Sequence, residues 1–354
     1  LPIFTFSETR FQTNLLYIQK NFERALSELK LNINHILFID GVDIRPQGIE
    51  YLEYLDCVKG LANAVWQLNN DFFPSIRDSK GRLKVVMLIR PDIFGSLALQ
   101  NQNTKIRSNS VLLDWRTSYE DYKTSSLFIM ADKLLQSQQS KEEKHNLKIG
   151  ECWEYYFPFQ TQSSSGYNDS SFIAFLRNSF YRPRDIVMML EIIKENNIEA
   201  CEREKTVNSW SDIDNHNFRR KLSDYLLGEI KDQISFYYNE NDYELFIKFF
   251  EFLNGDTRFN YEKYKIAYDN LVNHITSLDL QTPNFMDSPN KFLQFLYELN
   301  VICYVEDVVG HKPFIHWCFR ERSYSNISPK VKEDVRYELF YALAGSVNMG
   351  KKRK

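Results

Sequence analysis

The stretch Ile36-Leu-Phe-Ile-Asp-Gly-Val-Asp-Ile-Arg45 decides the fold that we expect for this chain. Its four consecutive apolar residues predict a buried strand of a parallel sheet, and the carboxylates of Asp40 and Asp43 follow directly. Because open α/β sheets hold ligands beyond the carboxyl ends of their strands, both acids are candidates for a ligand site. The alternative is a buried strand that ends in an Asp-Gly turn without a ligand role.

The composition bounds the class of protein. The 354 residues include 43% hydrophobic and 15% aromatic side chains, which can bury large cores and favour about two domains. The longest apolar runs fall far short of the ~20 residues that a membrane span needs, and no signal peptide opens the sequence, so we expect no membrane contact. Five scattered cysteines without a CxxC pair indicate a reduced, cytoplasmic setting. The net charge of −3 does not support nucleic-acid binding, which remains possible through a local patch.

Helical and strand patterns alternate through residues 1–140, which predicts an α/β domain. The apolar spacing predicts helices over residues 11–29, 48–73 and 119–136 and strands over residues 35–39, 83–89 and 110–115. Strands separated by helices of this length pair in parallel, and helices then cover both faces of the sheet. A polar junction or insertion, residues 141–171, follows this domain.

The remainder of the chain is expected to be mostly helical, with a helical domain at residues 172–240, a second domain at 241–348 and a basic tail at 349–354. The predicted helices span residues 172–180, 184–195, 217–237, 243–253, 261–277, 289–300 and 329–344. A strand pair is predicted at residues 301–307 and 313–319, and helices followed by such a ribbon resemble a winged-helix module. The helix 261–277 carries few basic residues, which favours packing or oligomerisation over DNA reading.

Several segments in the same order resemble the STAND branch of P-loop ATPases, which is related to the AAA+ and origin-recognition ATPases. Residues 36–43 are similar to the Walker B form hhhhDGhD of that branch, and residues 85–92 resemble its sensor 1 strand. Tyr181-Arg-Pro-Arg-Asp-Ile186 resembles the signature that opens a lid helix. Residues 40–46, 110–115 and 180–186 further resemble an uncharacterised bacterial group of P-loop ATPases linked to anti-phage defence.

This resemblance implies a parallel-sheet P-loop NTPase core, a helical lid, a winged-helix-like C-terminal domain, and ATP and Mg²⁺ as cofactors. Asp40 would hold Mg²⁺ through water, and Asp43 would orient the attacking water. Arg184 would be the sensor 2 arginine of the lid, the alternative being a solvated side chain in the first turn of a helix after a proline. Arg90 would sense phosphate, serve a neighbouring subunit, or pair structurally with a nearby acid. For Arg45, both a nucleotide role and a structural role are considered.

The sequence departs from this family at the phosphate loop. No Gly-x-x-x-x-Gly-Lys-[Ser/Thr] occurs in the 354 residues, so the amides and the lysine that cradle phosphates are missing, and the chain should not hydrolyse ATP alone. Only 35 residues precede Ile36, so we expect the first strand and the phosphate loop to lie upstream. A degenerate ATPase that keeps the scaffold for interactions is the less favoured interpretation.

The function expected of the complete protein is therefore a nucleotide-switched ATPase, a P-loop NTP hydrolase acting in bacterial defence. ATP binding or hydrolysis would control its assembly or an associated effector, so the partners would be further copies of the chain or an effector protein. The alternative is a non-catalytic interaction or DNA-binding winged-helix module on a degenerate ATPase scaffold. A zinc site is not favoured, because the spacing of Cys303, His311, His316 and Cys318 matches no usual one.

Overall fold

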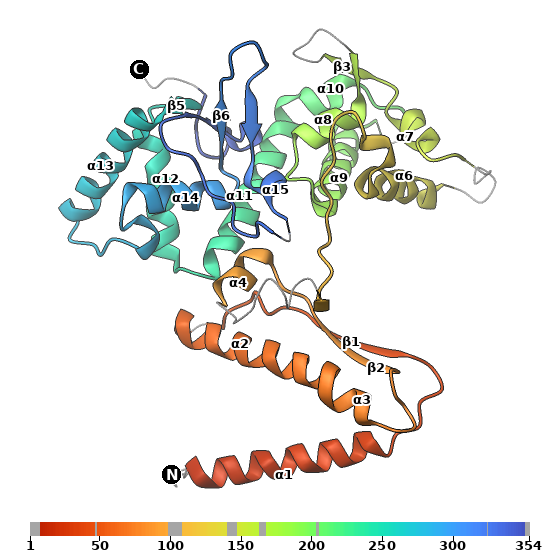
Figure 1. The fold of residues 1–354 in the computed structure, drawn as a ribbon. Helices are drawn as coiled ribbons and strands as arrows, with labels where there is room; N and C mark the ends of the chain where they lie inside the picture. The colour runs from red at the N-terminus through yellow and green to blue at the C-terminus, as the bar shows by residue number, and fades with distance from the viewer. Residues whose placement is uncertain are drawn as a thin grey trace. The chain divides into compact units, whose positions relative to one another are not determined.

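The structure is a computed structural model that describes residues 8–46, 48–97, 108–139, 147–162, 168–202, 205–323 and 325–350. It has the predicted mixed α/β character, with many helices and small sheets (Figure 1). The chain divides into two compact units, Leu1–Gln102 and Asn103–Lys354, and each is described by itself. None of the described helices combines the length and the apolar character that crossing a bilayer requires.

The first unit contains the predicted parallel strand pair. Its elements are α1 (Glu8–Ser27), β1 (His35–Ile39), α2 (Tyr51–Gln67), η1 (Leu68–Phe72), α3 (Phe73–Ser75), β2 (Leu83–Met87) and α4 (Pro91–Ser96). The two strands pair in parallel, from His35 opposite Leu83 to Ile39 opposite Met87. The strand predictions at residues 35–39 and 83–89 are therefore confirmed. The helix predicted over residues 48–73 is confirmed as α2, but it continues into the π-helical turn η1 before α3.

The prediction that helices bury the first strand on both faces is wrong for the described residues. Ile36, Leu37 and Phe38 expose 54%, 62% and 59% of their surface. The reason is that α2 and η1 pack against β2, and the small core of this unit gathers around Val85 of that strand. β1 is therefore an apolar strand whose side chains are largely exposed.

The two edges of this small sheet differ. On the outer edge of β2, the Asn69 side chain of η1 donates from Nδ2 to the Val85 carbonyl (2.7 Å) and accepts the Val85 N–H at Oδ1 (2.9 Å). The turn η1 therefore closes that edge with a side chain. On the outer edge of β1, the backbone groups of Ile36 and Phe38 point away from β2, and no described backbone group bonds to them.

The third predicted strand, residues 110–115, is not a strand in the structure. This segment is irregular, and Val111 and Leu113 are 82% and 70% exposed. Near its end, Asp114 forms a local ion pair with Arg116. Arg116 also donates to the Arg320 carbonyl (3.0 Å), which ties the segment to a distant part of the second unit.

The N-terminal half of the second unit is a helical cluster with one small hairpin. Its elements are η2 (Tyr122–Thr124), α6 (Ser126–Gln138), α7 (Glu151–Tyr156), β3 (Gln160–Gln162), β4 (Asn168–Ser170), α8 (Ser171–Arg177), α9 (Pro183–Glu199), α10 (Trp210–Asp214) and α11 (His216–Ser235). The predicted helices at 172–180, 184–195 and 217–237 are confirmed as α8, α9 and α11. Residues 122–138, which the sequence analysis placed in the first domain, pack here against Trp153 and Phe172.

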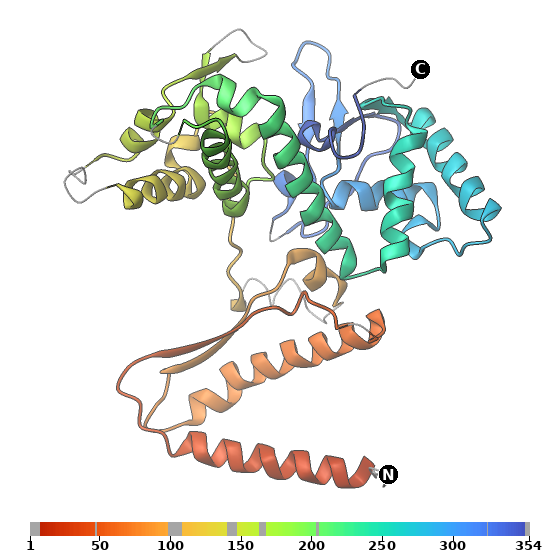
Figure 2. The same cartoon turned by 180° about the vertical axis from the view of Figure 1, so that it is seen from behind.

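The C-terminal half combines helices with a four-stranded antiparallel sheet in the order β5-β8-β6-β7. Its elements are α12 (Glu240–Phe252), β5 (Arg258–Asn260), α13 (Tyr261–Ser277), η3 (Asn284–Met286), α14 (Pro289–Glu298), β6 (Ile302–Glu306), β7 (Phe314–His316), α15 (Cys318–Glu321), β8 (Arg336–Leu339) and η4 (Tyr341–Leu343). The predicted helices at 243–253, 261–277 and 289–300 are confirmed, and so is the strand pair formed by β6 and β7. Seen from behind, α11 is the long helix that leads from the first half of the unit into α12 (Figure 2).

The prediction of a helix over residues 329–344 is wrong. This segment forms β8 and the short turn η4 instead. Tyr337 and Leu339 are buried while Arg336 is exposed, which is the two-residue alternation of a strand that covers a core on one face. β8 pairs with both β5 and β6, so long-range pairing decides its conformation.

Candidate functional site

The carboxyl ends of β1 and β2 meet at one edge of the sheet, as the sequence predicts for a ligand site. The Ile39 carbonyl accepts the Leu88 N–H (2.8 Å), so the segments that follow the two strands leave side by side. Asp40 is exposed there, and its Oδ1 accepts the Gly41 N–H (2.8 Å). Gly41 has φ +79°, a conformation that costs glycine little. Within the described ranges, Asp40 Oδ2 has no hydrogen-bond partner.

Arg90 and Asp43 approach each other at the same edge. Arg90 Nη1 lies 3.9 Å from Asp43 Oδ2. Two shorter hydrogen bonds join Arg90 to Asp92, from Nε to Oδ1 (3.2 Å) and from Nη2 to Oδ2 (2.5 Å). This bidentate pair sits at the start of α4, where Pro91 occupies the first turn, so Asp92 fixes the plane of the guanidinium. The structural pairing of Arg90, one of the three roles considered for it, is present.

The loop that follows β1 is tied to itself and to α2. Arg45 Nη1 donates to the Ile49 carbonyl (2.7 Å), and the Tyr54 hydroxyl donates to the carbonyl of the buried Val42 (3.3 Å). Burial raises the pKa of Tyr54, and the nearby Asp43 carboxylate raises it further, so this hydroxyl stays a neutral donor. Arg45 therefore has a structural role in the loop, while a nucleotide role for it stays a prediction.

The donor set at this edge fits a hard cation that keeps most of its own water. Asp40 and Asp43 supply carboxylate oxygens, the ligand type that Mg²⁺ prefers, and Mg²⁺ is commonly held by one or two carboxylates together with substrate phosphates. No group of three His, Cys, Asp or Glu side chains suited to a metal occurs within the part of the chain that the structure describes. The edge therefore suits a metal that arrives with a ligand better than a closed structural metal site.

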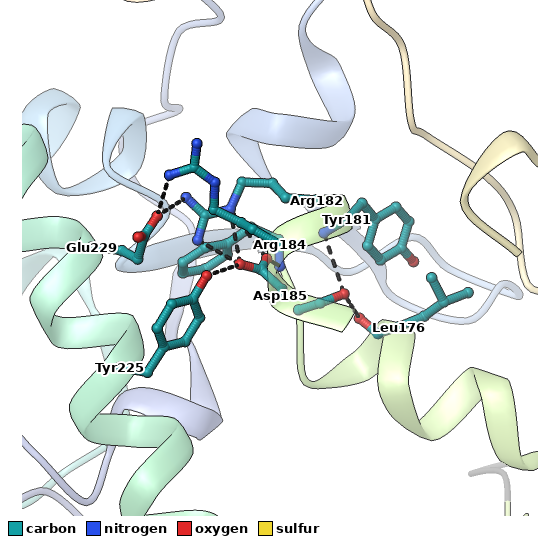
Figure 3. Close-up of polar contacts among 9 residues, drawn as sticks. Leu176, Tyr181, Arg182, Arg184, Asp185, Tyr225 and Glu229 are labelled. Atoms are coloured by element: carbon teal, nitrogen blue, oxygen red, sulfur yellow. Dashed lines mark hydrogen bonds and ion pairs between the residues drawn. The ribbon is translucent and has the colours of Figure 1, made fainter. Parts of the chain in front are cut away.

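Arg184, the predicted sensor 2 residue, lies in the second unit at the start of α9. Pro183 occupies the first turn of this helix, as the sequence analysis assumed. The Arg184 side chain is 68% exposed, and its Nη1 lies 3.1 Å from Glu229 Oε2 on α11 (Figure 3). Arg182 Nη1 lies 2.9 Å from the same oxygen. One carboxylate oxygen of α11 therefore binds two guanidinium groups from the start of α9.

A buried carboxylate organises this corner from the other side. Asp185 is fully buried and accepts hydrogen bonds from the Phe180 N–H (2.8 Å), from Arg182 and from the Tyr225 hydroxyl (3.0 Å) (Figure 3). Burial raises the pKa of Tyr225, and the charge of Asp185 raises it further, so the tyrosine remains a donor. Tyr181 adopts φ +57°, a left-handed conformation that is uncommon for a bulky residue. The buried carboxylate thus joins the tight turn before α9 to α11.

Sequence reasoning missed the two carboxylates, Asp185 and Glu229, that bind the arginines Arg182 and Arg184. Asp185 carries one usable signal, because acids in the first turn of a helix are stabilised by its dipole. Glu229 carries none, because 45 positions separate it from Arg184 and no local pattern links the two. The structure describes Asp40, Asp43, Arg45 and Arg90 in one unit and Arg184 in the other.

Three of the four residues considered for zinc have other surroundings. His316 lies between two carboxylates, with Nε2 3.0 Å from Glu306 and Nδ1 3.0 Å from Glu321, and its ring stacks on Tyr304. Cys303 and Cys318 are buried cysteines. These contacts give His316 a structural role in joining β6, β7 and α15.

No protein-family model, no curated protein and no solved structure matches this chain. The fold and the site together define a mixed α/β protein with an acidic, arginine-lined edge on a parallel strand pair. A second arginine cluster opens a long helix in the other unit.

Proposed function

We propose that this chain belongs to a nucleotide-switched ATPase of the STAND/AAA+ type, whose ATP binding or hydrolysis controls assembly or an associated effector in bacterial defence. The observation that carries the proposal is the meeting of Asp40, Asp43 and Arg90 at the carboxyl edge of two parallel strands, with Arg90 3.9 Å from Asp43. Open α/β sheets bind their ligands at this edge, and an acid pair beside an arginine suits a metal-bound phosphate.

The proposed roles are those that the resemblance to P-loop ATPases implies, and the position of each side chain supports them. Asp40, exposed and with one unbonded oxygen, holds Mg²⁺ through water, and Asp43 orients the water that attacks the terminal phosphate. Mg²⁺ supplies charge neutralisation of the phosphates when it is bound. Arg90, held in its plane by Asp92, faces the phosphate, and Arg45 shapes the loop beside it. Arg184 senses the nucleotide from the lid.

The same proposal assigns a P-loop core to residues 1–140, a helical lid to residues 172–240 and a winged-helix domain to residues 241–348. The order α12, β5, α13, α14, β6 followed by further antiparallel strands supports the last assignment. The proposal also requires a phosphate loop from residues outside the 354, because none of them forms one.

The test uses the protein expressed from its complete gene, with ATP affinity and turnover measured with and without Mg²⁺. We expect Mg²⁺-dependent ATP binding, and we expect Asp40→Asn to lower turnover by about 100-fold or more, because a charge-stabilising group is lost from the reaction. Asp78→Asn is the matched control, since this acid is exposed in the same unit and pairs only loosely with Lys30 (3.9 Å). Absence of ATP binding would refute the proposal. An unchanged mass in light scattering on addition of nucleotide would refute its assembly part.

The alternative is a non-catalytic interaction or DNA-binding module, which the element order of the C-terminal half also suits. The charge on α14 opposes DNA reading, because Lys291 is bound to Asp287 (2.6 Å) and no other lysine or arginine lies on that helix. Fluorescence anisotropy with a DNA duplex at several salt concentrations distinguishes the two functions, since phosphate contacts make affinity fall steeply with salt.

A further inference from the structure

Arg184 is mostly exposed to solvent, and it also forms an ion pair within the same unit. Its guanidinium lies 3.1 Å from Glu229 Oε2, and Glu229 itself is only 18% exposed (Figure 3). A phosphate oxygen and a carboxylate oxygen bind guanidinium in the same way. A phosphate that binds Arg184 at Nη1 must therefore compete with a carboxylate of the same chain.

The two arginines that share Glu229 are held very differently. Arg182 is bound to the buried Asp185 through Nε (3.0 Å) and Nη2 (2.6 Å) and also reaches Glu229. Among the residues that the structure describes, Arg184 forms an ion pair with Glu229 alone. Arg182 is therefore fixed in place, while Arg184 is attached by a single partly exposed contact, a type of ion pair that contributes little to stability.

Release of Arg184 leaves no isolated charge behind. Glu229 keeps its contact with Arg182 (2.9 Å), so the carboxylate remains paired when the second guanidinium leaves. Leaving one partner of an ion pair buried and unpaired would be costly, and the shared oxygen avoids that cost. With Arg184 gone, the remaining charges of Arg182, Asp185 and Glu229 sum to −1, which favours its return.

We propose that Glu229 is a positioning residue that holds Arg184 at the start of α9 and sets how strongly a nucleotide phosphate must compete for this arginine. The inference rests on the proposed function, in which Arg184 senses the nucleotide. It adds a consequence for α11: the helix that carries Glu229 loses one of its contacts with α9 when the phosphate binds. Glu229 thereby links nucleotide binding to the packing of these two helices.

The experiment measures ATP and ADP affinity in the protein expressed from its complete gene, for Glu229→Gln, Arg184→Gln and the double variant. Glu229→Gln removes the competing charge and should tighten ATP binding by about two- to five-fold, the range set by a partly exposed ion pair. The gain should vanish in the Arg184→Gln background, which a merely structural role of Glu229 does not predict. Glu240→Gln is the matched control, because this acid pairs with Lys231 of the same α11 and should leave ATP affinity unchanged.

A second variant at the same position distinguishes a change in ATP affinity from a loss of folding. Glu229→Asp keeps the charge near Arg182 but shortens the side chain, and it should also tighten ATP binding, by less than Glu229→Gln. If Arg184→Gln weakens ATP binding while both Glu229 variants leave it unchanged or weaker, the positioning role is overturned and the proposed function stands. If Arg184→Gln does not alter ATP affinity, the inference is likewise overturned. If the unaltered protein binds no ATP at all, the proposed function and this inference fall together.

Discussion

Replacing Asp185 by asparagine should destabilise the second unit strongly, because this carboxylate is fully buried and receives hydrogen bonds from three residues. Asparagine keeps the size but turns one acceptor oxygen into a donor that faces other donors. Breaking a buried ion pair by removing one partner costs about 3–5 kcal/mol. We expect about 3 kcal/mol, the lower end of that range, because Arg182 retains Glu229 and its side chain is 31% exposed.

Urea unfolding followed by tryptophan fluorescence measures this effect, since Trp153 is fully buried in the core of the same unit. With a slope of about 3 kcal/mol per molar urea, a loss of about 3 kcal/mol lowers the midpoint by about 1 M. Glu199→Gln is the control: this side chain is 58% exposed, and its partner Lys221 keeps a second carboxylate, so the change should stay within about 0.5 kcal/mol. Equal midpoints for Asp185→Asn and the control would refute the reasoning.

Three further predictions concern single side chains. Asn69→Leu should destabilise the first unit by about 1–3 kcal/mol and speed hydrogen exchange of the β2 amide that Asn69 covers, whereas Asn70→Leu, a neighbour that bonds only its own helix, should not. Burial raises the pKa of Cys152 to about 11 and of Cys303 to about 12, so peptide mapping after alkylation at pH 8 should find both unmodified while the two exposed thiols react. The Arg116 hydrogen bond lowers the pKa of Asp114, so this carboxylate stabilises the fold above its unfolded pKa and loses that contribution as the pH falls through the folded pKa. Urea midpoints at pH 7 and pH 3 should therefore differ less in Asp114→Asn than in the unaltered protein.

The strand pair of the first unit was predictable because its signals are local. A largely apolar run marks each strand, and a connection long enough for a helix makes the pairing parallel. The same logic failed at residues 110–115, where an apolar run is irregular rather than a strand. It failed again at residues 329–344, where the partners of β8 lie far away in the sequence.

The candidate site likewise has one contact that local sequence signals predict and another that they do not. The proximity of Asp43 and Arg90 follows from the parallel pairing, since the carboxyl ends of neighbouring strands meet at one edge. The pairing of Arg184 with Glu229 depends on how α9 packs against α11, which no short pattern specifies. Long-range side-chain partners were therefore beyond sequence reasoning.

The closed edge of β2 also limits how copies of the first unit can associate. Because Asn69 occupies the backbone groups of Val85, a new strand can join the described sheet only beside β1. Pairing through one edge is self-limiting: two copies that meet there use up the available backbone groups of both. Growth into a fibre requires two open edges on each copy. With Asn69 covering β2, the described sheet has one open edge and can form a closed pair of copies. Without that asparagine it would have two open edges, and copies could then polymerise.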